Sequence, residues 1–414
     1  MTNRIYPRLA IPETLAAGPG PGNTDERVLQ AFAGAGVADH MQADVLRGMI
    51  ECKHMLRQIW GTQNTYTFAV AGTGFSGLDV MFSAVMPGDK VVAFSNGTFS
   101  GIDALTLRIK AATQAELAEA PLNPDAASVT VIDVPHGESV TGNMVEAVLA
   151  EHSPKWAFMA HWETGSGRIN DIRGFSDACE RHGVLGLVDA VSSLGVENFS
   201  IDDYPGIVGW ASCPQKGLCC LPLTYAPVSF RDAYIDSLNA TGAYTYVHNP
   251  IFEARHWGIV DGADVEKGTY HRTHSGYAVA AFHESLRLTL QEGLSGRASS
   301  YSSHEAALRE AVTAMGCEVT SNMTSLLVLN LPESLAGREM ELVQNCRAAG
   351  FGIWPTLSEP IQIRIGILNQ LRASAIQDIA NRFADAMRAL GTDIDQTAID
   401  TILARHYAPA AAAQ

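Results

Sequence analysis

Short apolar runs alternate with longer amphipathic segments through the first 230 residues of the chain. The runs have the length and the β-branched and aromatic content of strands, and the segments between them are long enough for crossover helices. Six such runs begin near residues 66, 90, 128, 156, 184 and 207. This alternation predicts a doubly wound α/β fold with a mainly parallel sheet.

The residues that flank these segments indicate where several helices begin and end. Asn23 followed by Glu26 is typical of a capping arrangement before the apolar pattern RVLQAF. Gly183 predicts the end of the helix DIRGFSDACERH, because glycine readily adopts the left-handed conformation that follows many helices. Residues 142–152, GNMVEAVLAEH, have helical apolar spacing and predict a further helix.

A different pattern follows the long helical stretch THSGYAVAAFHESLRLTLQEGL. Helix-like and strand-like segments alternate there in the order SSHEAALREAVTAMG, TSLLVLNL, ELVQNCRAAG, QIRIGIL and SAIQDIANRFADAMRALG, which predicts a small α+β domain. We expect an N-terminal segment over 1–25, a large domain over 26–285 and the small domain over 286–414. We expect its low-complexity tail, APAAAAQ, to fray.

Composition restricts the classes of partner. The 414 residues include only six lysines and carry a formal net charge of −16, which argues against a nucleic-acid-binding surface. Because no apolar run reaches 18 residues and the first 20 lack the apolar core of a secretory signal, we expect a cytoplasmic protein that binds no membrane. The seven cysteines lack metal-ligand spacing, so we expect buried free thiols and no metal site.

Three charged residues stand alone in apolar stretches. Lys216 is the only charge near GWASCPQKGL, Asp189 ends the run VLGLVDA, and Arg364 lies inside IQIRIGIL. Each would be costly to bury without a partner. Asp189 and Lys216 could form a buried ion pair while Arg364 bonds carbonyl groups at a sheet edge. A ligand that completes all three is the other explanation.

A glycine-rich turn indicates the chemistry of such a ligand. AVAGTGFSGLDV predicts a strand, a turn through Gly72 and Gly74, and a helix from about Phe75 whose free N–H groups can bind an anion. The turn is not the dinucleotide-binding fingerprint, because Gly77 comes one residue early, and alone it is ordinary chain geometry. Pyridoxal 5′-phosphate (PLP) combines an anion with a ring nitrogen suited to Asp189 and an aldehyde that forms a Schiff base with lysine.

On these residues the chain resembles the alanine/serine:glyoxylate aminotransferases, the class V group of fold-type I PLP enzymes. The motifs that carry the resemblance are LAAGPGPGNTDERVLQAFAGAGVADHM, AVAGTGFSGLDVMFSAVMPGDKVVAFSNGTFSGIDA, HWETGSGRINDIRGFSDACERHGVLGLVDAVSSLG, SCPQKG and QIRIGIL. The resemblance implies a large domain with a mainly parallel seven-stranded sheet and a small C-terminal α+β domain.

The resemblance also assigns roles to individual residues. It implies that Lys216 is the Schiff-base lysine and the catalytic base, and that Asp189 faces the ring nitrogen. It implies that Arg364 and Gly20 bind the substrate, Arg364 through the substrate carboxylate. The residues that it implies in coenzyme binding are Thr73, Gly74, Phe75, Phe99, Thr164, Asp189, Val191, Gln215, Lys216, Tyr270 and Thr273.

Tyr270 and Thr273 resemble residues that reach the phosphate of the neighbouring subunit, which implies a homodimer with shared active sites. The alternative is that both only begin the long helix, with Thr273 as its cap. Phe99 stands where the family often has tryptophan, and GLCCLPLTYAP replaces the family's Pro-Pro-Gly turn after the lysine. We interpret His40 and His161 as packing or hydrogen-bonding residues.

The function implied by the resemblance is transfer of an amino group from a small amino acid, alanine or serine, to a 2-oxo acid such as glyoxylate or pyruvate. Three alternatives stay open: a transaminase that uses pyridoxamine or an aminophosphonate with pyruvate, a PLP-dependent lyase, and a binding module without turnover. The lyase would need a mobile cysteine of low pKa, for which Cys346 is the nearest candidate upstream of Arg364.

Overall fold

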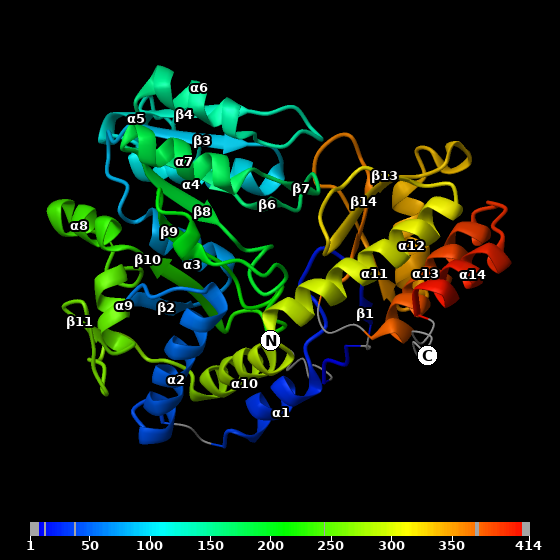
Figure 1. Ribbon diagram of the computed structural model, residues 1–414, viewed down its shortest axis with the longest axis horizontal. Coiled ribbons are helices and arrows are strands. Elements are labelled where there is room, and N and C mark those ends of the chain that lie inside the picture. The colour runs from blue at the N-terminus through cyan, green and yellow to red at the C-terminus, as the bar shows by residue number, and fades with distance from the viewer. Residues whose placement is uncertain (1–7, 12–13, 37–38, 244, 369–371, 408–414) are drawn as a thin grey trace, which may run out of the picture.

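A seven-stranded sheet organises the larger part of the molecule (Figure 1), in the strand order β2-β10-β9-β8-β5-β3-β4. The computed structural model describes residues 8–11, 14–36, 39–243, 245–368 and 372–407, so the predicted fraying of the tail lies outside it. The strands are β2 (Tyr66–Ala71), β3 (Val91–Ser95), β4 (Val129–Asp133), β5 (Trp156–Ala160), β8 (Leu185–Asp189), β9 (Ile207–Ala211) and β10 (Tyr225–Phe230).

Six of these strands are the six apolar runs, and they share one direction. β10 was not among the predicted runs, and it is antiparallel to both neighbours, β2 and β9. It contains Pro227, which has no N–H to donate and is therefore unusual inside a sheet. The predicted α/β class and mainly parallel sheet are confirmed.

Helices surround the sheet, and several of them pack directly on it (Figure 1). They are α1 (Glu26–Gly34), α2 (Ala43–Trp60), α3 (Gly74–Phe82), α4 (Thr98–Ala111), α5 (Gln114–Glu119), α6 (Gly142–His152), α7 (Ile172–His182), α8 (Asp232–Thr241), α9 (Pro250–His256) and α10 (Gly276–Glu292). Short elements complete this part: β6 (Trp162–Glu163), β7 (Arg168–Ile169), the 3-10 turn Ile201–Asp203, β11 (Ile259–Val260) and β12 (Ala263–Asp264).

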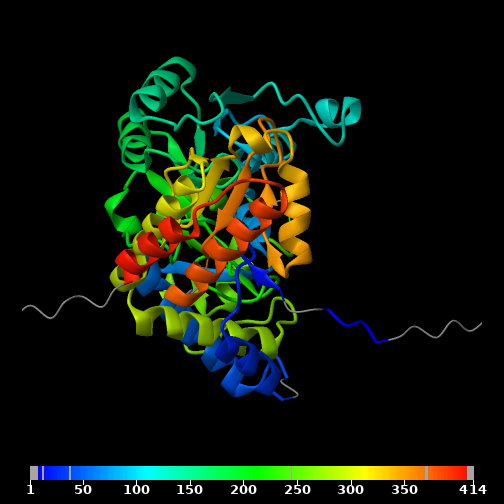
Figure 2. The same cartoon turned by 90° about the vertical axis from the view of Figure 1, so that its right-hand side faces the viewer.

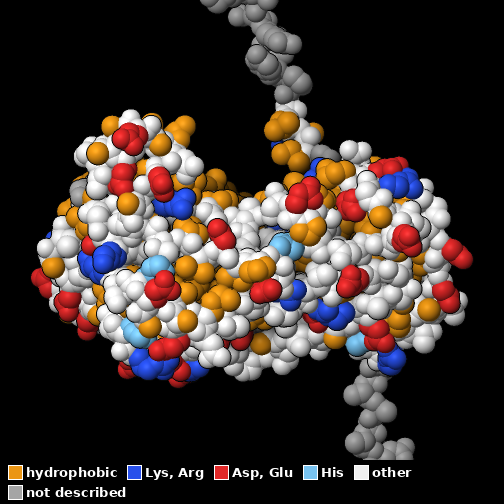
Figure 3. Space-filling view, turned by 90° about the horizontal axis from the view of Figure 1, so that it is seen from above, with side chains coloured by type: hydrophobic (Ala, Val, Ile, Leu, Met, Phe, Trp, Pro, Cys, Tyr) orange, Lys and Arg blue, Asp and Glu red, His pale blue; other side chains and the backbone are white. Residues whose placement is uncertain are grey.

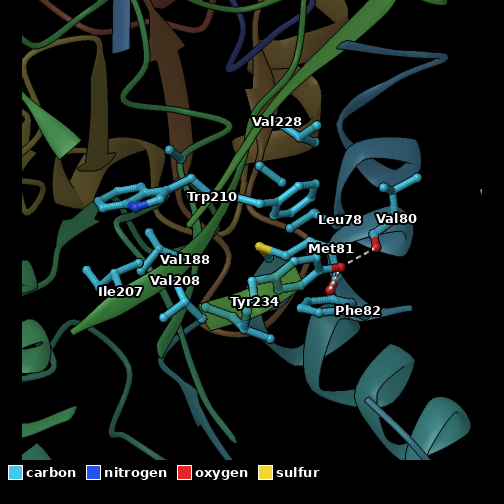
Figure 4. Packing of buried hydrophobic residues seen from close by; sticks show 14 of the residues in the cluster. Leu78, Val80, Met81, Phe82, Val188, Ile207, Val208, Trp210, Val228 and Tyr234 are labelled. Carbon is cyan, nitrogen blue, oxygen red and sulfur yellow. Dashed lines mark hydrogen bonds between the residues drawn. The ribbon is translucent and has the colours of Figure 1, made fainter. Parts of the chain in front are cut away.

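Aromatic and aliphatic side chains fill the space between the sheet and α3 (Figure 4). The ring of Tyr234 stacks on Phe230 with 4.1 Å between the ring centroids. Its buried hydroxyl lies 3.0 Å from the carbonyl oxygens of Val80 and Met81 at the end of α3, so the polar atom is satisfied. This packing fixes α3 against the sheet and with it the turn where α3 begins.

A four-stranded sheet, in the order β13-β14-β17-β16, organises the C-terminal part, which lies in front in Figure 2. Its elements are α11 (Leu294–Ala314), β13 (Glu318–Val319), β14 (Leu326–Asn330), the 3-10 turn Glu333–Leu335, α12 (Glu339–Ala348), β15 (Phe351–Gly352), β16 (Trp354–Pro355), β17 (Ile363–Gly366), α13 (Ala373–Ala389) and α14 (Gln396–Tyr407). The N-terminal strand β1 (Leu15–Ala16) pairs in parallel with β15 and so joins the N-terminal segment to this second core.

The predicted cap of α1 is wrong, and so is the alternative in which Thr273 caps α10. Asn23 does not cap α1: Asp25 does, by accepting the N–H of Arg27, while the Asn23 amide pairs with the backbone of Ala16. Thr273 does not cap the long helix α10, because the side chain of Ser275 accepts the N–H of Ala278 there. In both cases a second polar residue nearer the helix takes the position.

The predictions for Gly183 and for the burial of the cysteines are confirmed. Gly183 follows α7 with φ 64°, in the left-handed region. All seven cysteines, which lie among the described residues, are buried, and none of them forms a disulfide. No helix among the described residues is both long and apolar enough to cross a bilayer. Acidic and basic side chains are interspersed on the face shown in Figure 3, without a continuous basic area. The domain boundaries after residues 25 and 285 stay predictions.

Candidate active site

A cavity of about 190 Å³ lies where loops that follow the sheet strands meet the N-terminal segment. Because the parallel strands end at the same edge of the sheet, residues far apart in the sequence converge there. Nine predicted site residues line this cavity: Gly20, Gly74, Phe75, Phe99, Thr164, Asp189, Val191, Gln215 and Lys216. Thr73, Tyr270, Thr273 and Arg364 are not part of the lining.

Lys216 lines the cavity and is partly buried. Its Nζ donates to the hydroxyls of Ser192, at 3.0 Å, and Thr164, at 3.3 Å, and lies 5.4 Å from the centroid of the Phe99 ring. Burial lowers the pKa of the Lys216 amine, although Cys213 and the nearby acids act against that shift. A lysine placed among hydroxyls with a lowered pKa is suited to act as a nucleophile or a base.

The Asp189 carboxyl ends β8 and is 6% exposed. Its Oδ1 accepts the N–H of Val191 at 2.6 Å, and Lys216 donates to the two hydroxyls instead of to this carboxylate. Burial raises the pKa of Asp189, against the opposing effects of the Val191 N–H and the Lys216 amine. The simple Asp189–Lys216 ion pair therefore does not explain the two isolated charges, and no cation among the described residues contacts the carboxyl.

The helix α3 begins at the cavity without a side-chain cap. The Thr73 side chain makes no capping hydrogen bond, so the first N–H groups of α3 are available to an anion. Gly74 is required here, because a Cβ on it would lie 2.8 Å from Cγ2 of Val191 and 3.1 Å from Cβ of Cys213. The lining residue Gln215 adds a buried oxygen, Oε1, that has no hydrogen-bond partner among the described residues.

The N-terminal segment closes the cavity next to the lysine. Gly20 has φ 121°, and a Cβ on it would meet Cε and Cγ of Lys216 at 3.3 Å. The N–H of Gly22 donates to the carbonyl oxygen of Gln215 at 3.1 Å. The segment therefore packs directly on the lysine turn.

Arg364 lies on β17 and is 2% exposed. Its Nε and Nη2 donate to the Pro355 carbonyl oxygen at 3.0 and 2.9 Å, and Nη1 donates to the Thr164 carbonyl oxygen at 3.1 Å. Burial lowers the pKa of the guanidinium to about 10, so it remains a cation at neutral pH. Three of its five N–H groups are used, and two have no acceptor among the described residues.

Comparison with known proteins identifies the family. No protein-family model matches the chain. The alanine–glyoxylate aminotransferase of Oryctolagus cuniculus is 32% identical over 289 residues, which cover 69% of this chain and 68% of the rabbit protein. The chain belongs to the alanine–glyoxylate aminotransferase family.

Solved structures agree with that assignment. An alanine–glyoxylate aminotransferase from Nostoc sp. superposes with a TM-score of 0.82 at 25% identity, over 93% of this chain and 98% of that one. The ureidoglycine–glyoxylate aminotransferase of Bacillus subtilis has the same fold, with a TM-score of 0.85 at 21% identity, over 97% of this chain and all of the other. As a member of this aminotransferase family, the chain is a PLP-dependent transaminase.

Two predicted residues of the family pattern lie outside the cavity. Tyr270 is 58% exposed, and its hydroxyl lies 3.3 Å from that of the exposed Thr273. Neither residue contacts the cavity of its own chain, and Thr273 does not cap α10.

Sequence reasoning missed six lining residues: Pro19, Pro21, Leu78, Asp103, Trp162 and Ser192. Pro19, Pro21 and Ser192 are adjacent to a predicted site residue, and Trp162 and Leu78 lie two and three residues from one, so proximity in the sequence could have indicated them. Asp103 is different, because it lies four residues after Phe99. Helical spacing places positions i and i+4 on one face of α4, and this was the signal available.

Proposed function

We propose that this chain binds PLP covalently at Lys216 and transfers the amino group of a small, neutral amino acid to glyoxylate or pyruvate. The observation that carries the proposal is the position of the Lys216 amine. It lies at a cavity, oriented by two hydroxyls, and not paired with the buried acid of the same cavity.

The donors and acceptors of the cavity fit PLP. Asp189 is a buried carboxyl that needs a cation, which the protonated ring nitrogen supplies. The uncapped start of α3, with Thr73, Gly74 and Phe75, fits the phosphate group. Phe99 and Val191 are lining residues with the apolar surface that a flat ring needs on its faces.

Bound PLP supplies an electron sink for the pair of electrons left when a proton leaves the α-carbon of the amino acid. The proton itself is handled by the protein. Once the substrate amine has replaced Lys216 on the coenzyme, the freed Nζ, with its lowered pKa, would take the proton from the substrate α-carbon, hold it between the hydroxyls of Thr164 and Ser192, and give it up again when the amino group is transferred. Asp189 would keep its negative charge at the ring nitrogen.

The site offers one carboxylate anchor. The two unused N–H groups of Arg364 match the two oxygens of one carboxylate. The charged residues that line the cavity are Asp103, Asp189 and Lys216, and Arg364 borders the cavity through its bond to the carbonyl oxygen of the lining residue Thr164, so among the described residues no arginine in the lining can pair with an acidic side chain. Alanine and serine satisfy this restriction. The names of the rabbit and Nostoc relatives favour alanine as donor and glyoxylate as acceptor.

We extend the proposal to the assembly. The exposed pair Tyr270 and Thr273 offers hydroxyls that no group of its own cavity uses. In a homodimer these hydroxyls would complete the phosphate site of the other subunit.

The lyase alternative is disfavoured by Cys346. Its side chain is fully buried in the second hydrophobic core, on α12, and burial raises the pKa of the thiol to about 12. A reactive cysteine needs exposure and a low pKa. The pyridoxamine and aminophosphonate donors and the inactive module remain outcomes of the experiment below.

The test is a donor and acceptor matrix on the PLP-loaded protein. Alanine, serine, aspartate, glutamate, pyridoxamine and 2-aminoethylphosphonate are each paired with glyoxylate and with pyruvate, and the products are quantified by mass spectrometry. The proposal expects turnover with alanine or serine and none with aspartate. In an Arg364→Gln variant, the KM for alanine and serine should rise, with a smaller change in kcat. Arg347→Gln, on α12, is the control and should leave both values unchanged. Turnover confined to pyridoxamine or the phosphonate, or no turnover at all, would contradict the proposal.

A further inference from the structure

A second buried acid shares the cavity with Asp189. Asp103 lies on α4, one helical turn after Phe99, so both side chains project from the same face of the helix. It is 1% exposed and lines the same cavity as Asp189 and Lys216. Nothing in the transamination chemistry described above uses this carboxyl.

One oxygen of the Asp103 carboxyl, Oδ2, is buried and has no hydrogen bond among the described residues. The third acid nearby, Glu163, is satisfied, because its two oxygens accept the N–H groups of Ser100 and Gly165 at 2.6 Å. Lys216 donates to hydroxyls. Among the described residues, Asp103 is therefore the acid of this group with a buried oxygen that lacks a donor.

Electrostatics favours the protonated form of this acid. Burial, followed by the negative charges of Asp189 and Glu163, raises the pKa of Asp103 well above its ordinary value. The elements packed on α4 bring two further acids. Asp79 on α3 is engaged by Lys110 and His248, and Asp133 on β4 is exposed. Two neighbouring buried carboxyls that no cation among the described residues contacts do not readily ionise together.

We propose that Asp103 is a positioning residue that keeps its proton at neutral pH and supports the Asp189 carboxylate through a neutral O–H group in the same cavity. Asp189 is then the one anion of the pair and faces the ring nitrogen of the coenzyme. The inference rests on the proposed function for its consequence, but the proton on Asp103 is a property of the chain alone.

The proton is tested first, without any assay of activity. Infrared spectra of the full chain in deuterated buffer at neutral pH, with and without PLP, should show the carbonyl stretch of a protonated carboxylic acid. The band should lose intensity in Asp103→Asn and keep it in the matched acid variant Asp133→Asn, while the buried Glu253, whose pKa burial also raises, contributes equally in both variants. If Asp103→Asn keeps the whole band, or the wild type has none, the proposal is wrong. This result is independent of whether PLP binds.

The coupling to Asp189 is tested by the pH dependence of PLP affinity. Asp103→Asn keeps a neutral donor and should bind PLP within about threefold of the wild type. Asp103→Leu removes the donor, and the acid limb of its affinity profile should move up by about one pH unit, which is about the effect of one hydrogen bond to a charged group. The shift should vanish in an Asp189→Asn background.

A merely structural Asp103 would leave the pH profile of the Leu variant unmoved, and that result would overturn the proposal. Failure of the wild type to bind PLP would instead refute the proposed function, while the infrared result would still decide the state of Asp103.

Discussion

Replacing Gly74 with alanine tests the fit between α3 and the coenzyme cavity. The added Cβ would lie 2.8 Å from Cγ2 of Val191, closer than such atoms normally approach, and 3.1 Å from Cβ of Cys213. Overpacking of this kind costs about 1–3 kcal/mol, whereas alanine favours a helix over glycine by at most ~1 kcal/mol. We expect a net loss of about 1–2 kcal/mol. Displacement of Val191 should also weaken PLP binding by about tenfold, which corresponds to ~1.4 kcal/mol.

Two control variants separate the contact from general effects of the substitution. Gly296→Ala is matched, because Gly296 also lies in the first turn of a helix, α11, and a Cβ there meets nothing within 4 Å. It should leave PLP affinity unchanged. In a Val191→Ala background the penalty of Gly74→Ala should shrink, because the nearest methyl group is gone. Affinity is measured by equilibrium titration with PLP, and stability by urea unfolding. A Gly74→Ala protein that equals the wild type in both would refute the reasoning.

Three further predictions concern residues around the site. Arg297→Met should destabilise the protein by about 3 kcal/mol in urea unfolding, because the buried guanidinium donates to the carbonyl oxygens of Gly195 and Gly217 beside the lysine turn. An unchanged unfolding midpoint would show that these hydrogen bonds do not stabilise the turn. Burial lowers the pKa of His161 to about 3, so below about pH 6.5 the unfolded chain binds more protons at this residue than the folded chain. This difference should lower the free energy of unfolding by ~1.4 kcal/mol per pH unit toward pH 4, and the decrease should be less steep in His161→Gln. Equal slopes in the two proteins would contradict a neutral buried imidazole. Cys346→Ala should lose stability through the core yet keep full kcat, whereas loss of turnover in a folded variant would revive the lyase alternative.

The fold followed from the sequence wherever a strand was a continuous apolar run. The run VLGLVDA became β8 with Asp189 at its end, and such runs are distinctive because a parallel strand is buried on both faces. β10 was not among the predicted runs. It is a central strand that contains Pro227, and a residue without an N–H group weakens the pattern of a strand.

The site was predictable where an isolated charge marked it. Lys216 and Asp189 each stood alone in an apolar stretch that had to be buried, which indicated a shared ligand. Both residues line the same cavity. Asp103 carried no comparable signal, since an acid in a helix is usually a solvated residue. Its burial depends on how α4 lies on the sheet. The Asn23 cap failed for a local reason, because Asp25 stands closer to the helix and caps it.

The central claim is that a single lysine, Lys216, forms the covalent bond with the coenzyme. Borohydride reduction of the PLP-incubated protein, followed by peptide mass mapping, measures this directly, because reduction fixes the bond at whichever lysine carries it. The chain offers only five other lysines as internal controls, namely Lys53, Lys90, Lys110, Lys155 and Lys267. The account predicts one pyridoxyl group, on the peptide that contains Lys216. A label on another lysine, or none on Lys216, would contradict it.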